Sequence, residues 1–423
     1  MNNKIRTIII TWFLLVTSLM ASAQTKSVTL DTCYALAEQN YPLTKQRTLI
    51  SKSREYSIQN ISKGYLPQFS IHGQATYQSD VTQIPIELPG MEIPTVSKDQ
   101  YKIYGEVNQT LYDGGKIKNE KKKEEANTRT EEQKLEVELY KLKDRINQLY
   151  FGILLMDEQL SQTNLLKNDI ELGIKNAQAL VNNGSAFKSS VDRLKAESLK
   201  VNQKAIELKA LRKAFAEMLG LFINTTLNEN TILVKPEFLI PSQEINRPEL
   251  QLFNYQLQGL DVRQKMIGSR NMPKLNFFFQ GGYGKPTFNF LSNDFDTYYI
   301  GGIRLNIPLS GLYTLKDEKA LIGLGKDQIQ VQREVFLFNT RLSLSQQNME
   351  IAKLEALLAT DNEIIELRTS IKNTASSQLK NGVITTNDFL EEVNAENNAR
   401  QSKILHEIQL LMAQYNQKNT SGN

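Results

Sequence analysis

The sequence predicts an α+β protein in which very long helices carry a small number of strands. Two stretches, 115–181 and 312–380, contain no proline and are rich in Lys, Glu, Gln, Leu and Ala. Four shorter segments alternate apolar and polar residues, which is the pattern of strands with two different faces. Each half of the chain holds one long stretch and two of the strand segments.

The first 23 residues predict an export signal. A basic start with Lys4 and Arg6 is followed by the apolar stretch 7–20 and then by small residues that suit a cleavage site. We expect 1–23 to be a signal peptide that is cleaved after Ala23. Beyond Ala23 no apolar run approaches the roughly 20 residues that a membrane helix needs. The mature chain is therefore expected to be exported and to lack a transmembrane helix.

The composition argues against several classes of function. The formal charge of +4 falls to +2 when Lys4 and Arg6 leave with the signal, which gives no general basis for nucleic-acid binding. Two histidines and one cysteine leave little for metal or nucleophilic chemistry. No convergent triad, metal-ligand spacing or phosphate loop appears in the sequence. We therefore expect neither an enzyme nor a cofactor.

The two halves of the chain repeat each other. Equivalent landmarks are offset by 206, 206, 197 and 198 residues, and the pairs are Pro42 and Pro248, Pro67 and Pro273, Gly114 and Gly311, and Gly184 and Gly382. A fixed offset of this kind is the mark of an internal repeat. We expect a first repeat at 24–223, an irregular connector at 224–245 and a second repeat at 246–423.

Each repeat is expected to contain a helix, two strands, a very long helix, a turn and a further helix. The segment 30–62 is predicted to be helical, with Thr29 as its N-cap and Asp31 in the first turn, where a negative charge suits the helix dipole. At 1.5 Å per residue each long helix would span about 100 Å. The other expected elements are strands at 65–78, 101–112, 273–283 and 298–309, a helix at 187–221, and turns at 182–187 and 380–386.

The four strand segments have the length and pattern of strands that cross a membrane. Each has 11 to 14 residues, which suffices for a tilted strand to span a bilayer. One face is apolar and tyrosines gather at the ends, as in the aromatic girdles of membrane barrels. A soluble sandwich is the alternative. Because four strands cannot close a barrel and lipid does not tolerate an open sheet edge, a membrane location requires several chains in one barrel.

The long helices are too polar to be surrounded by a core. The segment 115–150 carries the run KKKEE, which is typical of a solvated face. Helices with water on two faces suit a hollow tube in which only the seams between neighbours are apolar. A filamentous coiled coil would also explain the polarity, but it would not explain the strands and the export signal.

These features together resemble the TolC family of outer-membrane efflux proteins. The resemblance rests on the signal peptide at 1–23 and on the order of the features along 28–418. These are strands that begin near a proline, LYDGG (111–115) before a long helix, NRPEL (246–250) at the start of the second half, and a glycine at each helix turn. It implies a homotrimer whose chains share a twelve-stranded β-barrel in the outer membrane, continued by a helical barrel in the periplasm.

The resemblance also implies a function and partners. Such a protein would be a passive, porin-like exit duct in multidrug efflux or secretion, located in the outer membrane of a Gram-negative bacterium and in contact with its lipid. Its substrates would come from an inner-membrane pump of the RND or ABC type through a periplasmic adaptor, also called a membrane fusion protein. No cofactor is implied.

The resemblance places adaptor docking at the two turns. Glycine takes positive φ at little steric cost, so Gly184 and Gly382 suit the end of one helix and the reversal into the next. The candidate docking residues are Gly184, Ser185, Ala186, Phe187, Gly382, Val383 and Ile384. An ordinary helix hairpin without a docking role is the alternative interpretation.

Carboxylates gather just after the second turn, and the resemblance makes three of them a candidate periplasmic gate. Asp388, Glu391 and Glu392 have spacings that would place them together on one helix face, and Glu396 follows. Three chains would bring these carboxylates around a narrow pore that favours cations. A second interpretation stays open for Asp388, since Thr385 and Asp388 fit a capping box, as do Ser189 and Asp192 at the first turn.

A different class of function also fits part of the sequence. A periplasmic adaptor, or a coiled-coil structural or binding protein without a pore, would likewise be exported and rich in long helices. An adaptor should carry a compact β-rich segment beside a single helical hairpin. Two hairpins in tandem therefore favour the duct.

Overall fold

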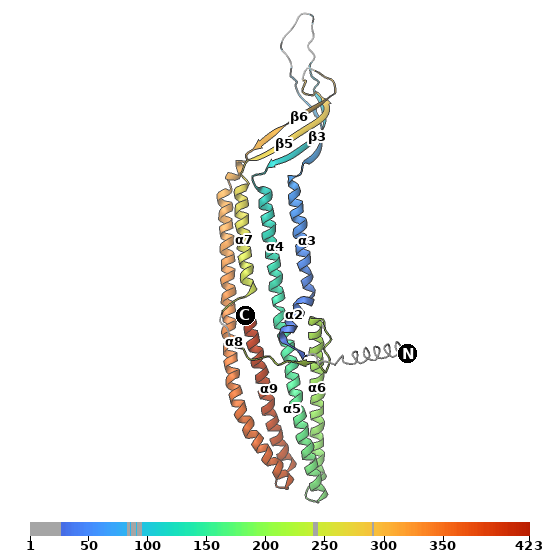
Figure 1. Cartoon of the computed structure of the whole chain (residues 1–423), viewed down its shortest axis with the longest axis vertical. Helices are drawn as coiled ribbons and strands as arrows, with labels where there is room; N and C mark the ends of the chain where they lie inside the picture. Colours follow the sequence, from blue (N-terminus) through green and yellow to red (C-terminus); the bar gives the residue numbers. More distant parts are fainter. Residues whose placement is uncertain (1–26, 83–84, 86–89, 91–94, 240–243, 290–291) are drawn as a thin grey trace, which may run out of the picture. The chain divides into compact units, whose positions relative to one another are not determined.

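The computed structural model describes residues 27–82, 85, 90, 95–239, 244–289 and 292–423 (Figure 1). The predicted signal peptide and its cleavage after Ala23 lie outside the described residues and stay predictions. Within the described part of the chain, no helix is both long and apolar enough to cross a membrane.

The chain folds into two compact units, and each draws segments from both halves of the sequence. The turn unit consists of the described residues of 27–44, Val137–Arg247 and Leu337–Asn423. The sheet unit consists of the described residues of Lys45–Glu136 and Pro248–Phe336. The helices α4 (Lys116–Tyr140) and α8 (Leu315–Lys380) contribute residues to both units. The two predicted repeats are a division of the sequence, and these compact units do not test it. The repeats therefore stay a prediction.

The sheet unit contains the four predicted strands as one antiparallel sheet. They are β2 (Gln68–Tyr77), β3 (Asp99–Tyr112), β5 (Lys274–Lys285) and β6 (Asp296–Asn306), in the order β2-β3-β5-β6. Each lies within a few residues of its predicted range. The helices of this unit are α3 (Lys45–Ser62), α7 (Pro248–Ser269) and the adjoining parts of α4 and α8 (Figure 1).

The predicted helix at 30–62 is wrong in one respect, because it is two helices. Thr29 caps α2 (Leu30–Asn40) as predicted, and its side chain accepts a hydrogen bond from the amide of Thr32. The helix then stops at Tyr41, which is extended, and a 3₁₀ turn over Pro42–Thr44 leads into α3. Proline explains the break, because it has no N–H to donate and disfavours a helical residue before it.

The two long helices differ in continuity. The stretch predicted at 115–181 is α4 followed by α5 (Leu142–Asn182), with a local turn at Lys141, so the single helix is wrong here. Lys141 keeps a helical φ of −63° but has a ψ of −17°, a value nearer to a 3₁₀ turn. In the second half, α8 runs unbroken from Leu315 to Lys380 after the 3₁₀ turn Ser310–Leu312.

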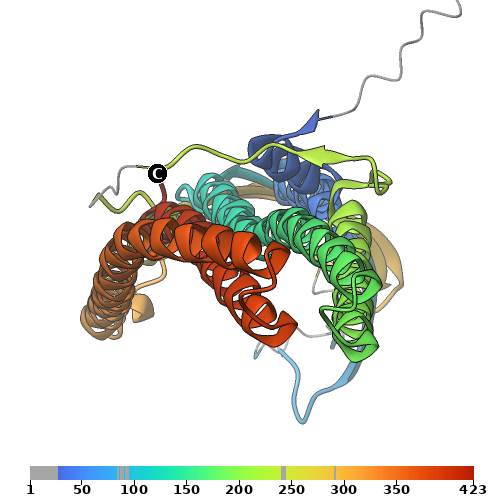
Figure 2. The same ribbon diagram turned by 90° about the horizontal axis from the view of Figure 1, so that it is seen from below.

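The turn unit is held together by apolar seams between helices. Figure 2 shows the pair α5 and α6 (Lys188–Ile223) in green and the pair α8 and α9 (Thr386–Ser421) in orange and red. One buried cluster joins these four helices; it contains Leu166, Ile170, Ala177, Val191, Leu194, Val201, Ala375, Leu379, Phe389, Leu390 and Val393. On α5 the buried positions recur every three to four residues, which is the spacing of a helix face turned to a core.

A two-stranded parallel sheet in the turn unit was not predicted. It pairs β1 (Ser27–Val28) with β4 (Ile232–Leu233), which lies in the connector at 224–245. The fully buried Tyr150 lies beside it, and its hydroxyl is 2.8 Å from the carbonyl oxygen of Val28 and 2.7 Å from that of Val234. Burial raises the pKa of Tyr150, so this side chain stays a neutral donor. Two-residue strands carry no periodicity that a sequence could reveal.

Candidate functional site

The two helix turns of the turn unit are built in the same way. Gly184 has a φ of +73° and Gly382 a φ of +72°, which are conformations that favour glycine. In the first turn the amide of Gly184 donates to the carbonyl of Val181 at 3.0 Å, and that of Ser185 donates to Leu180 at 2.8 Å. The second turn repeats this pair of bonds, which belong to a Schellman motif. Both helices therefore end as the glycines predict.

The turns expose one large apolar side chain each. Phe187 in the first turn is 83% exposed and Val383 in the second is 69% exposed. Ile384 packs against the buried cluster of the turn unit, and Ala186 is half-buried. Of the predicted docking residues, Phe187 and Val383 thus present apolar surface to solvent, whereas Ile384 contributes to the core.

The helices that follow the turns begin differently. At the start of α9, the Thr385 hydroxyl accepts from the amide of Asp388 at 3.3 Å, and the Asp388 carboxylate accepts from the amide of Thr385 at 2.9 Å. This is the predicted capping box. The hydroxyl of Thr385 also donates to Asp388 at 2.8 Å, and these bonds hold the pKa of Asp388 below its ordinary value.

The matching prediction at the first turn is wrong. The helix α6 begins at Lys188 with Phe187 as its N-cap, so Ser189 is already inside the helix and no side chain caps it. The backbone conformation places the first residue of α6 at Lys188. Phe187 is extended, and its carbonyl accepts a hydrogen bond from the amide of Ser190 at 3.0 Å.

The three predicted gate carboxylates have different surroundings. Asp388 is exposed, but its carboxylate is engaged in the cap. Glu392 lies 3.3 Å from the guanidinium of Arg368 on α8. Glu391 is exposed and, among the residues that the structure describes, has no cation within ion-pair distance. Glu391 is therefore the least compensated charge of the three.

A buried ionic cluster lies further along the same helices, and sequence reasoning missed all of it except Glu396. Glu396 is only 2% exposed and accepts hydrogen bonds from Arg400 and, at 3.2 Å, from the hydroxyl of Thr369. Lys372 lies 3.8 Å from Glu396 and 2.9 Å from Asp169 on α5. The cluster joins α5, α8 and α9. The spacing of four residues between Glu396 and Arg400 was the one sequence signal for it.

Each of the two histidines lies near a carboxylate of a neighbouring helix or strand. His406 on α9 lies 2.7 Å from Asp361 on α8. His72 lies on β2, where its Nε2 is 2.9 Å from the hydroxyl of Ser70 and 3.8 Å from the carboxylate of Glu106. A catalytic relay needs the serine and the carboxylate on different ring nitrogens, and here both approach the same one.

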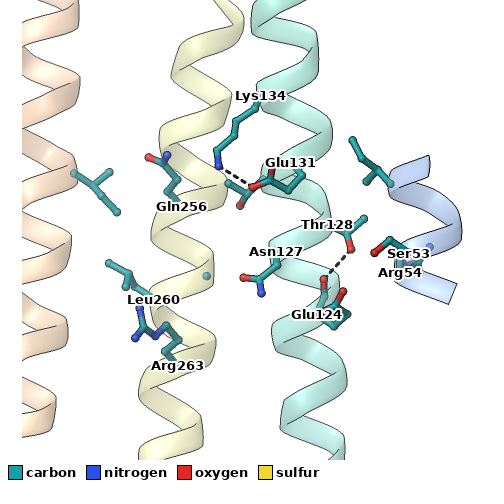
Figure 3. Close-up of a pocket in the computed structure, with 14 residues that line it drawn as sticks. Ser53, Arg54, Glu124, Asn127, Thr128, Glu131, Lys134, Gln256, Leu260 and Arg263 are labelled. Atoms are coloured by element: carbon teal, nitrogen blue, oxygen red, sulfur yellow. Dashed lines mark hydrogen bonds and ion pairs between the residues drawn. The ribbon is translucent and has the colours of Figure 1, made fainter. Parts of the chain in front are cut away.

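The sheet unit contains a groove of about 640 Å³ between its helices (Figure 3). It is lined by α3, α4 and α7, with Ile329 from α8. Its charges are mixed: Lys134 pairs with Glu131 at 2.7 Å, while Arg54 and Arg263 come from the two flanking helices. The hydroxyl of Thr128 in this lining donates to the backbone carbonyl of Glu124 at 2.8 Å. Across the described residues, no three His, Cys, Asp or Glu side chains gather as a metal site.

Solved structures of other proteins resemble this fold. No protein-family model and no curated protein matches the chain. The outer membrane protein VceC of Vibrio cholerae matches with a TM-score of 0.64 and 11% identity, over 93% of this chain and 96% of that one. The Neisseria gonorrhoeae MtrE outer membrane channel matches with a TM-score of 0.65 and 12% identity, over 93% and 89%.

A third solved structure agrees with these two. The Campylobacter jejuni CmeC outer membrane channel has a TM-score of 0.61 and 13% identity, over 93% of this chain and 85% of that one. At such low identities a likeness is evidence about the fold. The predicted fold is confirmed to that extent: this chain has the fold of the TolC family of outer-membrane channels.

Proposed function

We propose that this protein is the outer-membrane channel of a tripartite efflux or secretion system, acting as a passive duct in a homotrimer. The observation that carries the proposal is the four-stranded sheet, whose apolar face is open. Ile71 on β2 is 82% exposed, and it is accompanied on that face by Phe69, Ile103, Phe277, Phe279, Ile303 and Leu305. A soluble chain rarely exposes so large an apolar patch, and lipid is the partner that suits a whole sheet face.

The edges of the sheet support a shared barrel. The strands β2 and β6 are the two ends of the strand order, so each has one side without a partner strand in this chain. In lipid, such an edge would leave backbone N–H and C=O groups without hydrogen bonds. Pairing β6 of one chain with β2 of the next removes both edges. Three chains would then form a barrel of twelve strands, which exceeds the minimum of about eight.

The first experiment is the native mass of the protein extracted in mild detergent from the outer-membrane fraction. A trimer supports the shared barrel, and a stable monomer would exclude the duct. A matched pair of variants tests which sheet face meets lipid. Ile71→Glu, on the apolar face, should abolish assembly of the trimer in the membrane. Gln74→Glu, on the opposite face of the same strand, should leave assembly intact.

We further propose that the turns bind a periplasmic adaptor, which connects the duct to an inner-membrane pump of the RND or ABC type. Phe187 and Val383 support this, since each presents exposed apolar surface beside a glycine turn. The expected contact is apolar, with Gly184, Ser185, Ala186 and Gly382 allowing close approach. Phe187→Ser with Val383→Ser should weaken adaptor binding without lowering trimer mass, and unchanged binding would exclude the turns as the docking site.

The carboxylates of α9 are proposed as the gate of the duct, with Glu391 as the main contributor and Asp388 as both cap and pore residue. We expect the double variant Asp388→Asn with Glu391→Gln to lower the preference for cations in planar-bilayer recordings. Glu392→Gln is the matched control, because Arg368 already compensates that charge. Selectivity equal to that of the unmodified protein would remove Asp388 and Glu391 from the gate.

A further inference from the structure

The face of the sheet opposite to the apolar one carries a cluster of polar and aromatic side chains. The register places Ser70 opposite Glu106, which in turn lies opposite Gln280. The next row, two residues along, holds His72, Tyr104, Gly282 and Tyr298. Paired residues share a face, so the two rows lie side by side on one surface. In the proposed barrel this surface faces the lumen.

Glu106 is the centre of the cluster and its charge is poorly compensated. Its side chain is only 14% exposed. One carboxylate oxygen accepts from the amide of Asn108 at 3.1 Å, and the other accepts from the amide of Gln280 at 3.0 Å. Among the described residues, the imidazole of His72, at 3.8 Å, is the one basic group within 4 Å. A carboxylate shielded from water to this degree, with neutral hydrogen-bond donors, attracts a mobile cation.

Aromatic rings stand in the row beside this carboxylate. The ring of Tyr104 stacks on that of His72, with 5.0 Å between the centroids. Tyr298 lies on the other side of Gly282, and its ring meets Phe288 edge-to-face at 5.3 Å. A Cβ at Gly282 would come within 2.5 Å of the Cβ of Tyr104, so this position excludes any side chain. Because Gly282 has no side chain, no other side chain stands between Tyr104 and Tyr298 in this row, next to the row of Glu106.

We propose that Glu106, Tyr104 and Tyr298 form a binding site for organic cations, in which an ammonium group contacts the carboxylate and its apolar substituents contact the rings. A carboxylate attracts any cation, whereas aromatic faces favour an ammonium group with apolar substituents. A hydrated metal ion would gain little from the rings. The inference rests on the proposed function, since the site meets transported molecules only if this face lines a duct.

The test is block of single-channel current by benzyltrimethylammonium in planar bilayers that contain the full mature protein. All variants carry Asp388→Asn and Glu391→Gln, so that the carboxylates of α9 do not contribute. Glu106→Gln should raise the half-blocking concentration roughly tenfold, because a charge-assisted contact is lost. Tyr104→Leu should raise it roughly threefold, while Tyr104→Phe keeps the ring and should keep the block.

Two controls separate the site from general charge effects. Asp99→Asn removes an exposed carboxylate at the start of the same strand and should leave the block unchanged. Block by Mg²⁺ should respond to Glu106→Gln but not to Tyr104→Leu. Glu106→Gln keeps one of the two acceptor oxygens that Asn108 and Gln280 use, and trimer mass reports its folding.

The outcomes are distinct. Channels whose block is the same with and without Glu106→Gln would overturn the site while leaving the proposed channel in place. A loss of block with Glu106→Gln and none with Tyr104→Leu would overturn its preference for organic cations. If the unmodified protein forms no channels at all, the proposed function itself is wrong, and this site with it.

Discussion

At the scale of single residues, the approach of α9 to α5 depends on a glycine. A Cβ placed at Gly173 would lie 2.6 Å from a ring carbon of Phe389, whose side chain is buried in the apolar cluster of the turn unit. Glycine inside a helix otherwise costs about 0.5–1 kcal/mol relative to alanine. Gly173 thus allows α9 to pack closely on α5, although glycine lowers the helix propensity of α5.

We expect Gly173→Ala to lower the thermal midpoint of the protein, because overpacking of a core costs about 1–3 kcal/mol and exceeds the gain in helix propensity. Gly323→Ala is the control, since a Cβ at Gly323 on α8 meets no atom within 4 Å. That variant should raise stability by up to about 1 kcal/mol. Equal shifts in the two variants would show that Phe389 does not restrict position 173.

A second prediction at this scale concerns Cys33. Its side chain is buried in the turn unit, and burial raises the pKa of its thiol to about 12. Because the thiolate is the reactive form, maleimide at pH 8 should label the native protein at Cys33 far more slowly than the unfolded chain. A cysteine introduced at the exposed Ser185 is the control and should react quickly. Rapid labelling of native Cys33 would contradict its burial.

The raised pKa of Cys33 also predicts how the free energy of unfolding changes at high pH. The folded pKa lies above the ordinary value of 9.0, so the contribution of Cys33 is complete below pH 9 and is lost as the pH rises towards 12. Cys33→Ala should remove the share of this dependence that comes from the thiol, while the buried Tyr150, whose pKa is also raised, keeps its own share.

At the scale of elements, the sequence was most informative where a long pattern repeats. The alternation of the strands and the absence of proline from 312–380 predicted four strands and α8 within a few residues. Pro42 was noted as a landmark of the repeat, although its break in the first helix was not expected. Short pairings left no pattern: β1 and β4 have two residues each, and they are held by backbone bonds and by Tyr150.

The candidate site was predictable only where its chemistry is local. The glycine turns and the cap at Thr385 depend on neighbours in sequence, so they could be predicted. The cluster around Glu396 depends on Lys372 and Asp169, which come from two other helices. No local pattern relates positions 169, 372 and 396, because helix packing brings them together.

The difference between the two helix starts gives a prediction for α9. Thr385→Ala should destabilise the turn unit by about 1 kcal/mol, since it removes an N-cap. Ser189→Ala is the matched control and should have little effect, because Ser189 lies inside α6. The measurement is the thermal midpoint of each variant. If both variants lose the same stability, the two turns are capped alike and the structural difference is wrong.

Acid should weaken the same cap. Hydrogen bonds from Thr385 lower the pKa of Asp388, so the cap is complete above the ordinary pKa of the carboxyl and is lost as the pH falls through the lowered one. The unmodified protein and Asp388→Asn should therefore differ less in their free energy of unfolding in that acidic range than at neutral pH.

At the scale of the whole molecule, the question is what joins the helical pairs of the turn unit. Contacts in the apolar cluster stabilise the unit but are non-directional. The ion pairs of the ionic cluster, in contrast, fix the positions of α5, α8 and α9 relative to one another. Lys372 on α8 lies within ion-pair distance of Asp169 on α5 and of Glu396 on α9, so one side chain connects three helices. Its side chain is largely shielded from water, and pairs of this kind are more strongly coupled than exposed ones.

A double-mutant cycle measures that connection. Lys372→Met and Asp169→Asn should each lower stability, and together they should cost less than the sum, with a coupling of about 1 kcal/mol or more. The pair Lys353 and Glu350, 2.6 Å apart but exposed on α8, is the control and should couple by less than about 0.5 kcal/mol. Hydrogen exchange should show the Lys372→Met variant losing protection in α8 near residue 372. A coupling no larger than that of the exposed pair would mean that apolar packing alone joins α8 to α5, and Lys372 would then be a solvated lysine beside a carboxylate.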